Sequence, residues 1–284
     1  MRFSSELAAI DAGISPKNYP AEYYGETPRP QPIRRRPFLL CLGRHLHRII
    51  RGGRRISYLA CVVPPSWIDL ALPAQEEPGR VLDIGAGWGR FVAAAMSMRW
   101  KAEAVDFGDS ILDVGKVLNI PVYRGTLEEN LYCLSGGYDL ISMNRVLEHL
   151  PSLLEALQTA RALLNDAGVV RIQVPLWRPS FLGVFGKYWS PLDLPRHRWH
   201  FRPADIGRLA TQAGFDRSLY IPGPRTHPLS SSIKLWMRDQ ALLKRWHRFA
   251  SVDNRVLRMA LFPLGWWMGA IRRPFEATFY LMKT

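Results

Sequence analysis

The stretch VLDIGAGWGRF, from Val81 to Phe91, decides the fold of this 284-residue chain. It joins an apolar run that ends at Ile84 to a region of helical periodicity that begins at Arg90. A glycine-rich turn that follows a strand and precedes a helix lies at the carboxyl edge of a sheet, where open α/β sheets bind their ligands. The turn therefore raises the question of which small molecule it holds.

Downstream of this turn, short apolar runs alternate with helical periods, which predicts β-α-β-α units and a mostly parallel sheet. We expect strands at Arg80–Ile84, Ala102–Asp106, Val122–Tyr123, Tyr138–Asn144 and Gly168–Val174, with two later ones at RSLYI (217–221) and ATFYLMK (277–283). We expect helices at Arg90–Met98, Ile111–Leu118, Leu153–Leu164 and Pro203–Ala213. The last of these has proline in its first turn and glycine just after its end, as helices commonly do.

The spacing of the glycines excludes two common ligands. A dinucleotide site needs the pattern G-x-G-x-x-G, but here Gly85, Gly87 and Gly89 give G-x-G-x-G, and Arg90 occupies the place of the third dinucleotide glycine. A nucleoside triphosphate loop needs G-x-x-x-x-G-K-[ST], and neither Lys-Ser nor Lys-Thr follows.

Two acidic residues indicate what the turn holds instead. Asp83, two residues before the turn, would repel a pyrophosphate but attract an ammonium or sulfonium group. Asp106 ends the second expected strand, where a carboxylate accepts hydrogen bonds from ribose hydroxyls. A ribose, a cationic amino-acid tail and no phosphate describe S-adenosylmethionine. Two alternatives remain open: Asp83 can simply cap the turn, and Asp109 can compete with Asp106 for the ribose.

Four blocks in this order carry a family resemblance: VLDIGAGWGRF, AVDFGDS, YDLISMNRVLEHL and LLNDAGVVRIQVP. They resemble the class I S-adenosylmethionine-dependent methyltransferases, and the similarity runs from about Arg80 to Tyr220. A fifth block, YWSPLDLPRHRWHFRPADIGRLATQAGF, is similar to the subgroup that includes relatives of ubiquinone-biosynthesis O-methyltransferases and enzymes of polysaccharide clusters. The resemblance implies an α/β, doubly wound, Rossmann-like fold. Its seven-stranded sheet is mostly parallel, has an antiparallel last strand and carries helices on both faces.

The resemblance also implies a role for individual residues. Those expected to contact the methionine part of the cofactor are Asp83, Gly85, Ala86 and Gly87. Asp106 would hold the ribose, and Phe107 would pack on the adenine. Thr126 and Leu127 lie where the family often has an aspartate and its neighbour touching the adenine amine, so a backbone contact would replace that carboxylate. Asn144 would face the transferable methyl group.

Histidines supply the candidate catalytic residues. His149, just past the fourth expected strand, can act as a general base, since its pKa lies near neutrality, or can cap the next helix. His197 lies in a dense polar block with Asp193 and His200, where it either takes the acceptor's proton or helps to close a lid. Of the two, His197 is the favoured base. No cysteine or H-E-x-x-H pattern supports a metal site in this block, so we expect none.

The flanks differ from the middle of the chain in charge. The net charge is +4 over residues 1–79, +2 over 80–220 and +8 over 221–284. A nucleic-acid enzyme is usually basic around its active site too, so the nearly neutral middle argues against a nucleic-acid partner. Three widely spaced cysteines fit neither a disulfide framework nor a metal site and are typical of a reducing compartment.

These observations predict two regions. Residues 1–79 would form an arm and a basic amphipathic helix at Leu39–Ile50, acting as a substrate cap or a membrane-surface element. Residues 80–284 would form the methyltransferase domain, with a helical insertion rich in tryptophan and arginine at 229–274. Tryptophan beside arginine suits a membrane interface. A helical cap over the core and a stacking surface for nucleic acid are the alternatives.

No signal peptide is expected, because the first residues carry acids and no apolar core. The longest apolar run, Met259–Ile271, has 13 residues, fewer than the roughly 20 that span a bilayer. We therefore expect a cytoplasmic protein, peripheral at most to the inner membrane face. Its expected activity is O-methylation of a small-molecule, lipid-linked or glycan acceptor. A non-catalytic binding module and an RNA methyltransferase are the competing interpretations.

Overall fold

The computed structural model describes residues 79–222, 227–240, 255–271 and 273–283, and all structural statements below concern these ranges. Seven strands form one sheet in the order β3-β2-β1-β4-β5-β7-β6. Their bounds are β1 Arg80–Ile84, β2 Lys101–Asp106, β3 Val122–Arg124, β4 Tyr138–Asn144, β5 Leu164–Pro175, β6 Arg217–Pro222 and β7 Glu276–Met282.

Helices and short turns connect the strands. The α-helices are α5 Arg90–Ser97, α6 Ser110–Leu118, α7 Leu153–Leu163, α8 Pro179–Phe185, α9 Pro203–Gln212, α10 His227–Asp239 and α11 Arg255–Ala270. Short 3-10 turns are η4 Glu128–Cys133, η5 Leu147–His149, η6 Gly186–Tyr188 and η7 Ser190–Leu192. Every helix and strand expected between 80 and 222 is present, with ends that differ by one or two residues except at the junction of α7 and β5.

The sheet has the predicted mixed topology. Strands β1 to β5 pair in parallel, whereas β7 pairs antiparallel with both β5 and β6. The order of strands reverses beside β1, so the loops after β1, β2 and β4 converge at one edge, which is where such sheets bind ligands. The seven-stranded, doubly wound fold with an antiparallel last strand is therefore confirmed.

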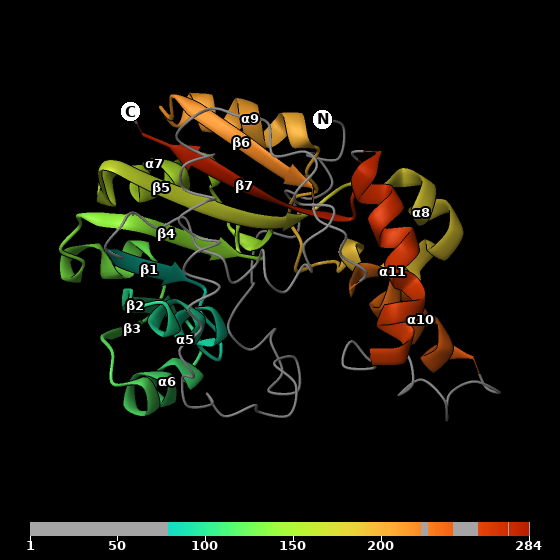
Figure 1. Cartoon of the computed structure of the whole chain (residues 1–284), viewed down its shortest axis with the longest axis horizontal. Coiled ribbons are helices and arrows are strands. Elements are labelled where there is room, and N and C mark those ends of the chain that lie inside the picture. The colour runs from blue at the N-terminus through green and yellow to red at the C-terminus, as the bar shows by residue number, and fades with distance from the viewer. Residues whose placement is uncertain (1–78, 223–226, 241–254, 272, 284) are drawn as a thin grey trace.

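Alternate residues of each strand feed two separate cores, as the two-residue period of a strand requires. One core joins the sheet to α7 and α9 and contains side chains such as Leu82, Ile141 and Ile172. The other joins it to α5 and α6 and contains Val81 and Leu140 on the opposite face. Helices cover both faces in Figure 1.

The junction between α7 and β5 differs from the prediction. We expected the helix to reach Leu164 and the strand to begin at Gly168, but α7 ends at Leu163 and β5 begins at Leu164. Leu164 already pairs with Tyr138, and the register shifts before Leu140 pairs with Val169. The extra residues form an irregularity in the ladder, which a strand can absorb without leaving the sheet.

A helical layer stands at the carboxyl edge of the sheet. In Figure 1, α8, α10 and α11 lie at the right, on the side towards which the arrowheads of β1, β4 and β6 point. Buried apolar side chains of α10, α11 and the nearby turns form a third core around Trp189, Leu229, Met268 and Phe275, and partly buried side chains of α8 pack against it. The described residues of the segment predicted as an insertion, 229–274, include most of α10, which begins at His227, and all of α11. The predicted N-terminal arm and helix at Leu39–Ile50 lie outside the described residues.

Candidate active site at the carboxyl edge of the sheet

The glycine-rich turn after β1 is tied to β2 by backbone hydrogen bonds. The N–H groups of Gly85 and Ala86 both donate to the carbonyl of Val105, at 2.8 and 3.2 Å. Gly85 and Gly87 have φ values of 70° and 53°, a left-handed conformation that side chains disfavour. A Cβ on Gly85 would lie 2.3 Å from Val146, but one on Gly87 would meet nothing within 4 Å. The turn therefore has no room for a side chain at position 85, whereas the space next to the Cα atom of Gly87 is open.

Asp83 lies near the end of β1, at the carboxyl edge of the sheet, and its side chain is almost completely buried. Burial raises the pKa of Asp83 to about 7, opposed by a hydrogen bond from Ser142 and by the positive charge of Arg171. The side-chain amide of Asn144 also donates to the Asp83 carboxylate, at 3.4 Å. A carboxylate that has lost its hydration gains from any cation placed beside it, so this position suits a positively charged ligand.

Asp106 lies at the tip of the neighbouring strand. Its carboxylate accepts hydrogen bonds from the backbone N–H groups of Gly87 and Gly108, both at 2.7 Å. An ionised carboxylate offers about four acceptor positions, so two remain for ribose hydroxyls. The alternative, Asp109, is exposed and pairs with Arg124 at 2.8 Å. Asp106 is therefore the better placed of the two acids, because it reaches into the turn itself.

The residues expected around the adenine lie on the far side of Asp106. Phe107 follows it directly and is partly buried. Thr126 and Glu129 exchange hydrogen bonds between side chain and backbone, the Thr126 N–H donating to the carboxylate at 2.7 Å. This capping arrangement commits the Thr126 hydroxyl to the start of η4. Leu127 is buried in the core beside it, so its side chain is not exposed to an adenine amine.

Asn144 belongs to a polar row that the sequence analysis did not identify. Its amide nitrogen donates to the Ser142 hydroxyl at 2.7 Å, and its amide oxygen accepts from the guanidinium of Arg171. Arg171 is fully buried in the middle of β5 and also donates to the Gln173 side chain at 3.2 Å. A buried cation, Arg171, thus holds the side chain of Asn144, which the resemblance predicts to face the transferable methyl group.

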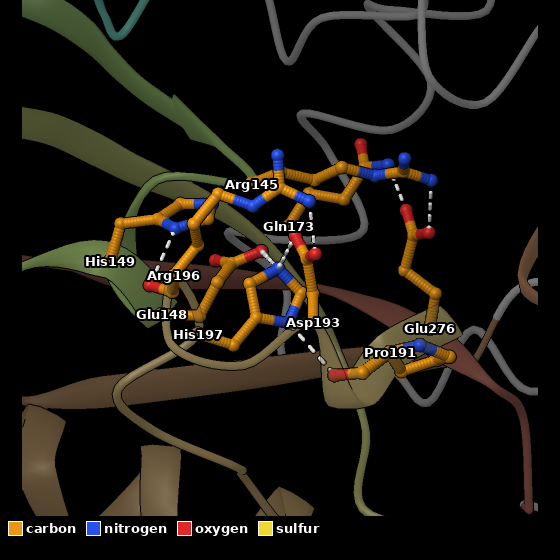
Figure 2. A network of polar contacts seen from close by, with 9 residues as sticks. All are labelled: Arg145, Glu148, His149, Gln173, Pro191, Asp193, Arg196, His197 and Glu276. Atoms are coloured by element: carbon orange, nitrogen blue, oxygen red, sulfur yellow. Dashed lines mark hydrogen bonds and ion pairs between the residues drawn. The ribbon is translucent and has the colours of Figure 1, made fainter. Parts of the chain in front are cut away.

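The row continues to the rim of the site. The Gln173 amide donates to the buried carboxylate of Glu276 on β7, which also accepts from Arg145 at 2.6 Å. Arg145 follows Asn144, has a φ of 58°, and leaves 39% of its side chain exposed. Figure 2 shows Arg145 and Gln173 meeting at Glu276. A positive φ is uncommon for a residue other than glycine. In this conformation the side chain of Arg145 reaches Glu276.

The two candidate histidines lie together, next to the same edge (Figure 2). Their ring centroids are 4.8 Å apart. His197 is buried, and its Nδ1 lies 2.8 Å from the carbonyl of Pro191, whereas the Nδ1 of His149 lies 3.0 Å from the carbonyl of Arg196. Since a carbonyl only accepts, each Nδ1 carries the hydrogen and each Nε2 keeps a lone pair.

Burial keeps both rings neutral. Burial, together with the nearby His149, lowers the pKa of His197 to about 4. It also lowers the pKa of His149, against the raising effect of the Arg196 carbonyl. An uncharged imidazole can accept a proton through Nε2. His200 is more distant, at 6.3 Å from the His197 ring, and lies beside Trp177.

Glu148 lies beneath the histidines and is fully buried. Neither of its carboxylate oxygens has a hydrogen-bond partner among the described residues, and burial raises the pKa of Glu148 to about 8. The Nε2 of His197 lies 4.0 Å from it and 3.7 Å from Asp193. Glu148, His149 and His197 each offer a ligand atom within 4.8 Å of the others. Such a group can share one cation, although no metal was expected in this block.

The polar block that carries His197 is docked on the backbone after β4. The N–H groups of Arg198 and Trp199 donate to the carbonyl of Glu148, at 2.9 and 3.3 Å. The indole of Trp199 donates to the carbonyl of Leu150 at 2.8 Å. These bonds fix the loop over the edge of the sheet, so the block brings His197 beside His149.

Comparison with known proteins identifies the class that this fold and edge define. A glycine-rich turn between two acid-tipped strands of a Rossmann-like sheet is the arrangement of a nucleoside-binding enzyme. Residues 53–217, more than half of the chain, match the family described as Methyltransferase domain. The chain therefore belongs to this methyltransferase family.

Individual relatives agree with the family assignment. The chain is 26% identical over 184 residues to a Burkholderia pseudomallei protein named ubiquinone biosynthesis O-methyltransferase, covering 60% of this chain and 77% of that one. It is 27% identical over 187 residues to a Pseudomonas aeruginosa protein of the same name, with the same coverage. A solved methyltransferase from Archaeoglobus fulgidus, dependent on S-adenosylmethionine, aligns with 84% of this chain and 99% of its own at a TM-score of 0.51 and 17% identity. That last likeness concerns the fold.

The protein is thus a methyltransferase whose cofactor is S-adenosylmethionine. The geometry of the edge fits this cofactor. The space above Gly87 is open, a buried carboxyl group faces it from β1, and a second one faces it from β2. Neither a dinucleotide loop nor a phosphate loop is present in the turn, in agreement with the glycine spacing.

Sequence reasoning missed Arg171, Gln173, Glu276 and Glu148 as parts of the site. A signal for two of them exists: Arg171 and Gln173 lie two residues apart in the otherwise apolar VVRIQVP, so they share one face of β5. Nothing local indicates that Glu276, more than a hundred positions later, faces them across β7. Glu148 directly precedes His149 in the sequence, and only its burial distinguishes it from a surface acid.

Two glycines of the turn give a matched pair of variants. Gly85→Ala is expected to destabilise the protein by about 3 kcal/mol, because it adds overpacking against Val146 to left-handed strain. Gly87→Ala carries only the strain, about 1–2 kcal/mol, but its new methyl group occupies the open space and should weaken cofactor binding. Urea unfolding and calorimetry measure the two effects. Equal losses of stability in both variants would contradict the geometry of the turn.

Asp83→Asn tests the buried carboxyl group. Because the pKa of Asp83 is raised to about 7 in the fold, its ionisation opposes folding, so the wild type loses stability relative to the variant as pH rises from about 4 to 7. Without cofactor, the variant should melt at a higher temperature at pH 8, with a smaller gap at pH 5. Wild-type affinity for the cofactor should fall about tenfold per pH unit below 7, and the variant should bind weakly at every pH.

Asp109→Asn is the control for this experiment, since it removes the same charge from an exposed position. It should leave both the melting temperature and the pH dependence of binding unchanged. A wild-type affinity that stays constant between pH 5.5 and 8 would show that Asp83 does not ionise in this range on binding.

Proposed function

We propose that this protein transfers a methyl group from S-adenosylmethionine to a hydroxyl oxygen of a small-molecule, lipid-linked or glycan acceptor. The observation that carries the proposal is the pair of buried carboxyl groups, Asp83 and Asp106, at the tips of adjacent strands on either side of the open glycine turn. When bound, the cofactor supplies a methyl group that its sulfonium has already made electrophilic. The work left to the chain is to bind, orient and deprotonate.

Asp83, Gly85, Ala86 and Gly87 would hold the methionine part of the cofactor, and Asp106 its ribose. Phe107, Thr126 and Leu127 would border the adenine, with backbone groups supplying the polar contacts because the Thr126 side chain caps η4. Asn144 would face the reacting methyl group from the end of β4. Holding acceptor and methyl about 3 Å apart supplies much of the rate enhancement in a displacement of this kind.

We propose His197 as the base that takes the acceptor's proton, with His149 beside it. Its Nδ1–H is fixed on the Pro191 carbonyl, so Nε2 is presented as the acceptor. The carboxyl groups of Asp193 and Glu148 lie 3.7 and 4.0 Å from that nitrogen. The Asp193 carboxylate would stabilise the positive charge that the ring gains on protonation, whereas Glu148, whose pKa burial raises to about 8, is mostly uncharged at neutral pH.

Relatives named ubiquinone biosynthesis O-methyltransferase support an oxygen as the acceptor atom. The apolar helical layer beside the site supports an acceptor with an apolar tail. A quinone precursor and a lipid-linked sugar are therefore the two acceptors to try first, and a short-chain soluble analogue of each separates chemistry from membrane access.

The test is transfer of a labelled methyl group to these acceptors, with the product identified by mass spectrometry. Asp83→Ala and Asp106→Ala should abolish cofactor binding while the circular dichroism spectrum is retained. His197→Gln should lower kcat by about a hundredfold or more and leave the cofactor Kd unchanged. Full activity of His197→Gln, with loss in His149→Gln, would assign the base to His149 instead. Transfer to no hydroxyl acceptor, with methylation of an RNA, would overturn the proposal.

We also propose that the protein contacts an anionic membrane surface through α11. No described helix has the length and apolar character needed to cross a membrane. However, α11 packs Leu261 and Met268 into the third core and turns its other faces outward. The large apolar side chains exposed on it and just after it are Met259, Phe262, Leu264, Trp266, Trp267 and Ile271.

The surrounding sequence supports a lipid partner. Residues 221–284 contain eleven basic and three acidic side chains, and one of the acids, Glu276, is buried. Anionic headgroups would pair with this excess of positive charge, and tryptophan is favoured at headgroup depth. A membrane seated on α11 would lie next to the carboxyl edge of the sheet, where an acceptor with a lipid tail must enter.

Flotation of the full chain with vesicles tests this contact. The wild type should float with vesicles containing 30% phosphatidylglycerol and float less with pure phosphatidylcholine vesicles. Trp266→Ser/Trp267→Ser should reduce flotation about tenfold, whereas Val117→Ser/Tyr132→Ser, which removes exposed apolar groups from α6 and η4, should not. Equal flotation of all three proteins would contradict the proposal. So would a wild type that does not float but loses a dimer in the tryptophan variant.

A further inference from the structure

A continuous row of polar side chains crosses four strands of the sheet on the face that carries α5 and α6. Asp83, Ser142 and Arg171 occupy directly paired positions on β1, β4 and β5. Cross-strand neighbours point to the same face, so the three side chains stand side by side. Asn144 and Gln173 form the next pair along β4 and β5. The row therefore consists of two adjacent rungs, one of three side chains and one of two, near the carboxyl ends of the strands.

Hydrogen bonds link these rungs in one direction. Arg171 donates to the amide oxygen of Asn144, and the amide nitrogen of Asn144 donates to Ser142 and Asp83. A side-chain amide accepts only through its oxygen and donates only through its nitrogen, so its orientation follows from its partners. Because Arg171 only donates, it fixes the oxygen of Asn144 on its own side and turns the nitrogen towards Asp83.

The far side of Arg171 is anchored as well. Its guanidinium donates to Gln173, which donates to the buried Glu276, and it lies 5.4 Å from the ring centroid of Phe91 on α5. Glu276 also binds Arg145 at the rim. Arg171 is thus held by direct contacts with β4 and α5 and, through Gln173 of its own strand, is linked to Glu276 on β7.

We propose that Arg171 is a positioning residue for the cofactor: it orients the Asn144 amide towards Asp83, and its charge keeps the Asp83 carboxylate ionised for a cationic ligand. This inference rests on the proposed role of Asp83 in holding the methionine part of S-adenosylmethionine. An apolar residue at position 171 would fill the interior equally well, so packing alone does not account for a fully buried cation there. A buried charge is costly unless it is paired and hydrogen-bonded.

The charged groups that act on Asp83 are few. Arg171 on β5 favours the ionised carboxylate and Asp106 on β2 disfavours it, while the neutral Ser142 and Asn144 of β4 donate hydrogen bonds to it. Without the Arg171 charge, Asp106 is the charged group that still acts on Asp83, and it disfavours the ionised carboxylate. The pH at which the protein becomes able to bind a cationic cofactor should therefore rise.

The experiment measures the Kd of S-adenosylmethionine by calorimetry between pH 6 and 9 for the full chain and its variants. Arg171→Met should move the midpoint of the pH dependence upward by about one unit. Affinity should then be about fivefold weaker than the wild type at pH 7 and within about twofold at pH 9. Arg171→Lys, which restores the charge, should return the midpoint towards the wild-type value. If Arg171→Met does not fold, Arg171→Gln carries the same test, since it keeps a donor but no charge.

Arg80→Met is the matched control. Arg80 binds Glu103 at 2.6 Å and the carbonyl of Gly136 at the opposite end of the sheet, so its loss should lower the melting temperature without moving the midpoint. A wild-type midpoint in both Arg171→Met and Arg171→Gln would overturn the inference and leave Arg171 a structural residue. The assay needs neither acceptor nor turnover, so its failure is distinct from failure of methyl transfer. Loss of all pH dependence in the wild type would instead remove the role of Asp83.

Discussion

The site depends on one unfavourable arrangement, a carboxyl group at the tip of β1 that has lost its water. Asp83 is enclosed by the turn, by β4 and by the polar row, and burial raises its pKa to about 7. Burying a charge without full compensation costs several kcal/mol, and here the compensation comes from Ser142, Asn144 and Arg171. A cation brought by the ligand completes it. The free energy lost in folding around Asp83 is thus available as selectivity for a positively charged cofactor.

The rest of the architecture keeps that carboxyl group next to the other parts of the site. Parallel strands deliver Asp83, Asp106 and Asn144 to one edge, and the short bonds from Gly85 and Ala86 to Val105 hold the turn between them. The block around His197 is fixed on the carbonyl of Glu148, and the third core supports α11 beside the same edge. The residues proposed to bind the cofactor, the proposed base and the helix proposed to contact a membrane therefore lie on separate elements next to one edge of the sheet.

The sequence determines the first of these parts far better than the others. Strand and helix periods, the glycine spacing and the acids at strand tips are local signals, and the fold they predicted is the one observed. The pairing of Arg171 with Asn144, and of Gln173 with Glu276, depends on register between strands that are distant in the chain. The neighbourhood of Glu148 and His197 depends on how one loop docks. The alternation of Arg171 and Gln173 with apolar residues in β5 predicts that the two side chains share one face of the sheet, but it does not predict their partners. The early start of β5 at Leu164 follows from an irregular ladder that periodicity does not encode.

Charges alternate along the polar row, and this has a consequence for how the site can change. Asp83, Arg171, Glu276 and Arg145 follow one another as acid, base, acid and base, joined through the neutral amides of Asn144 and Gln173. In a low-dielectric interior such a series is stable as a whole, and removing one member leaves an uncompensated charge beside its neighbours. Only Arg145, at the outer end, has substantial exposure to solvent. The exposed cation of Arg145 is thus bound to the same network as Asp83, the carboxyl group proposed to hold the cofactor.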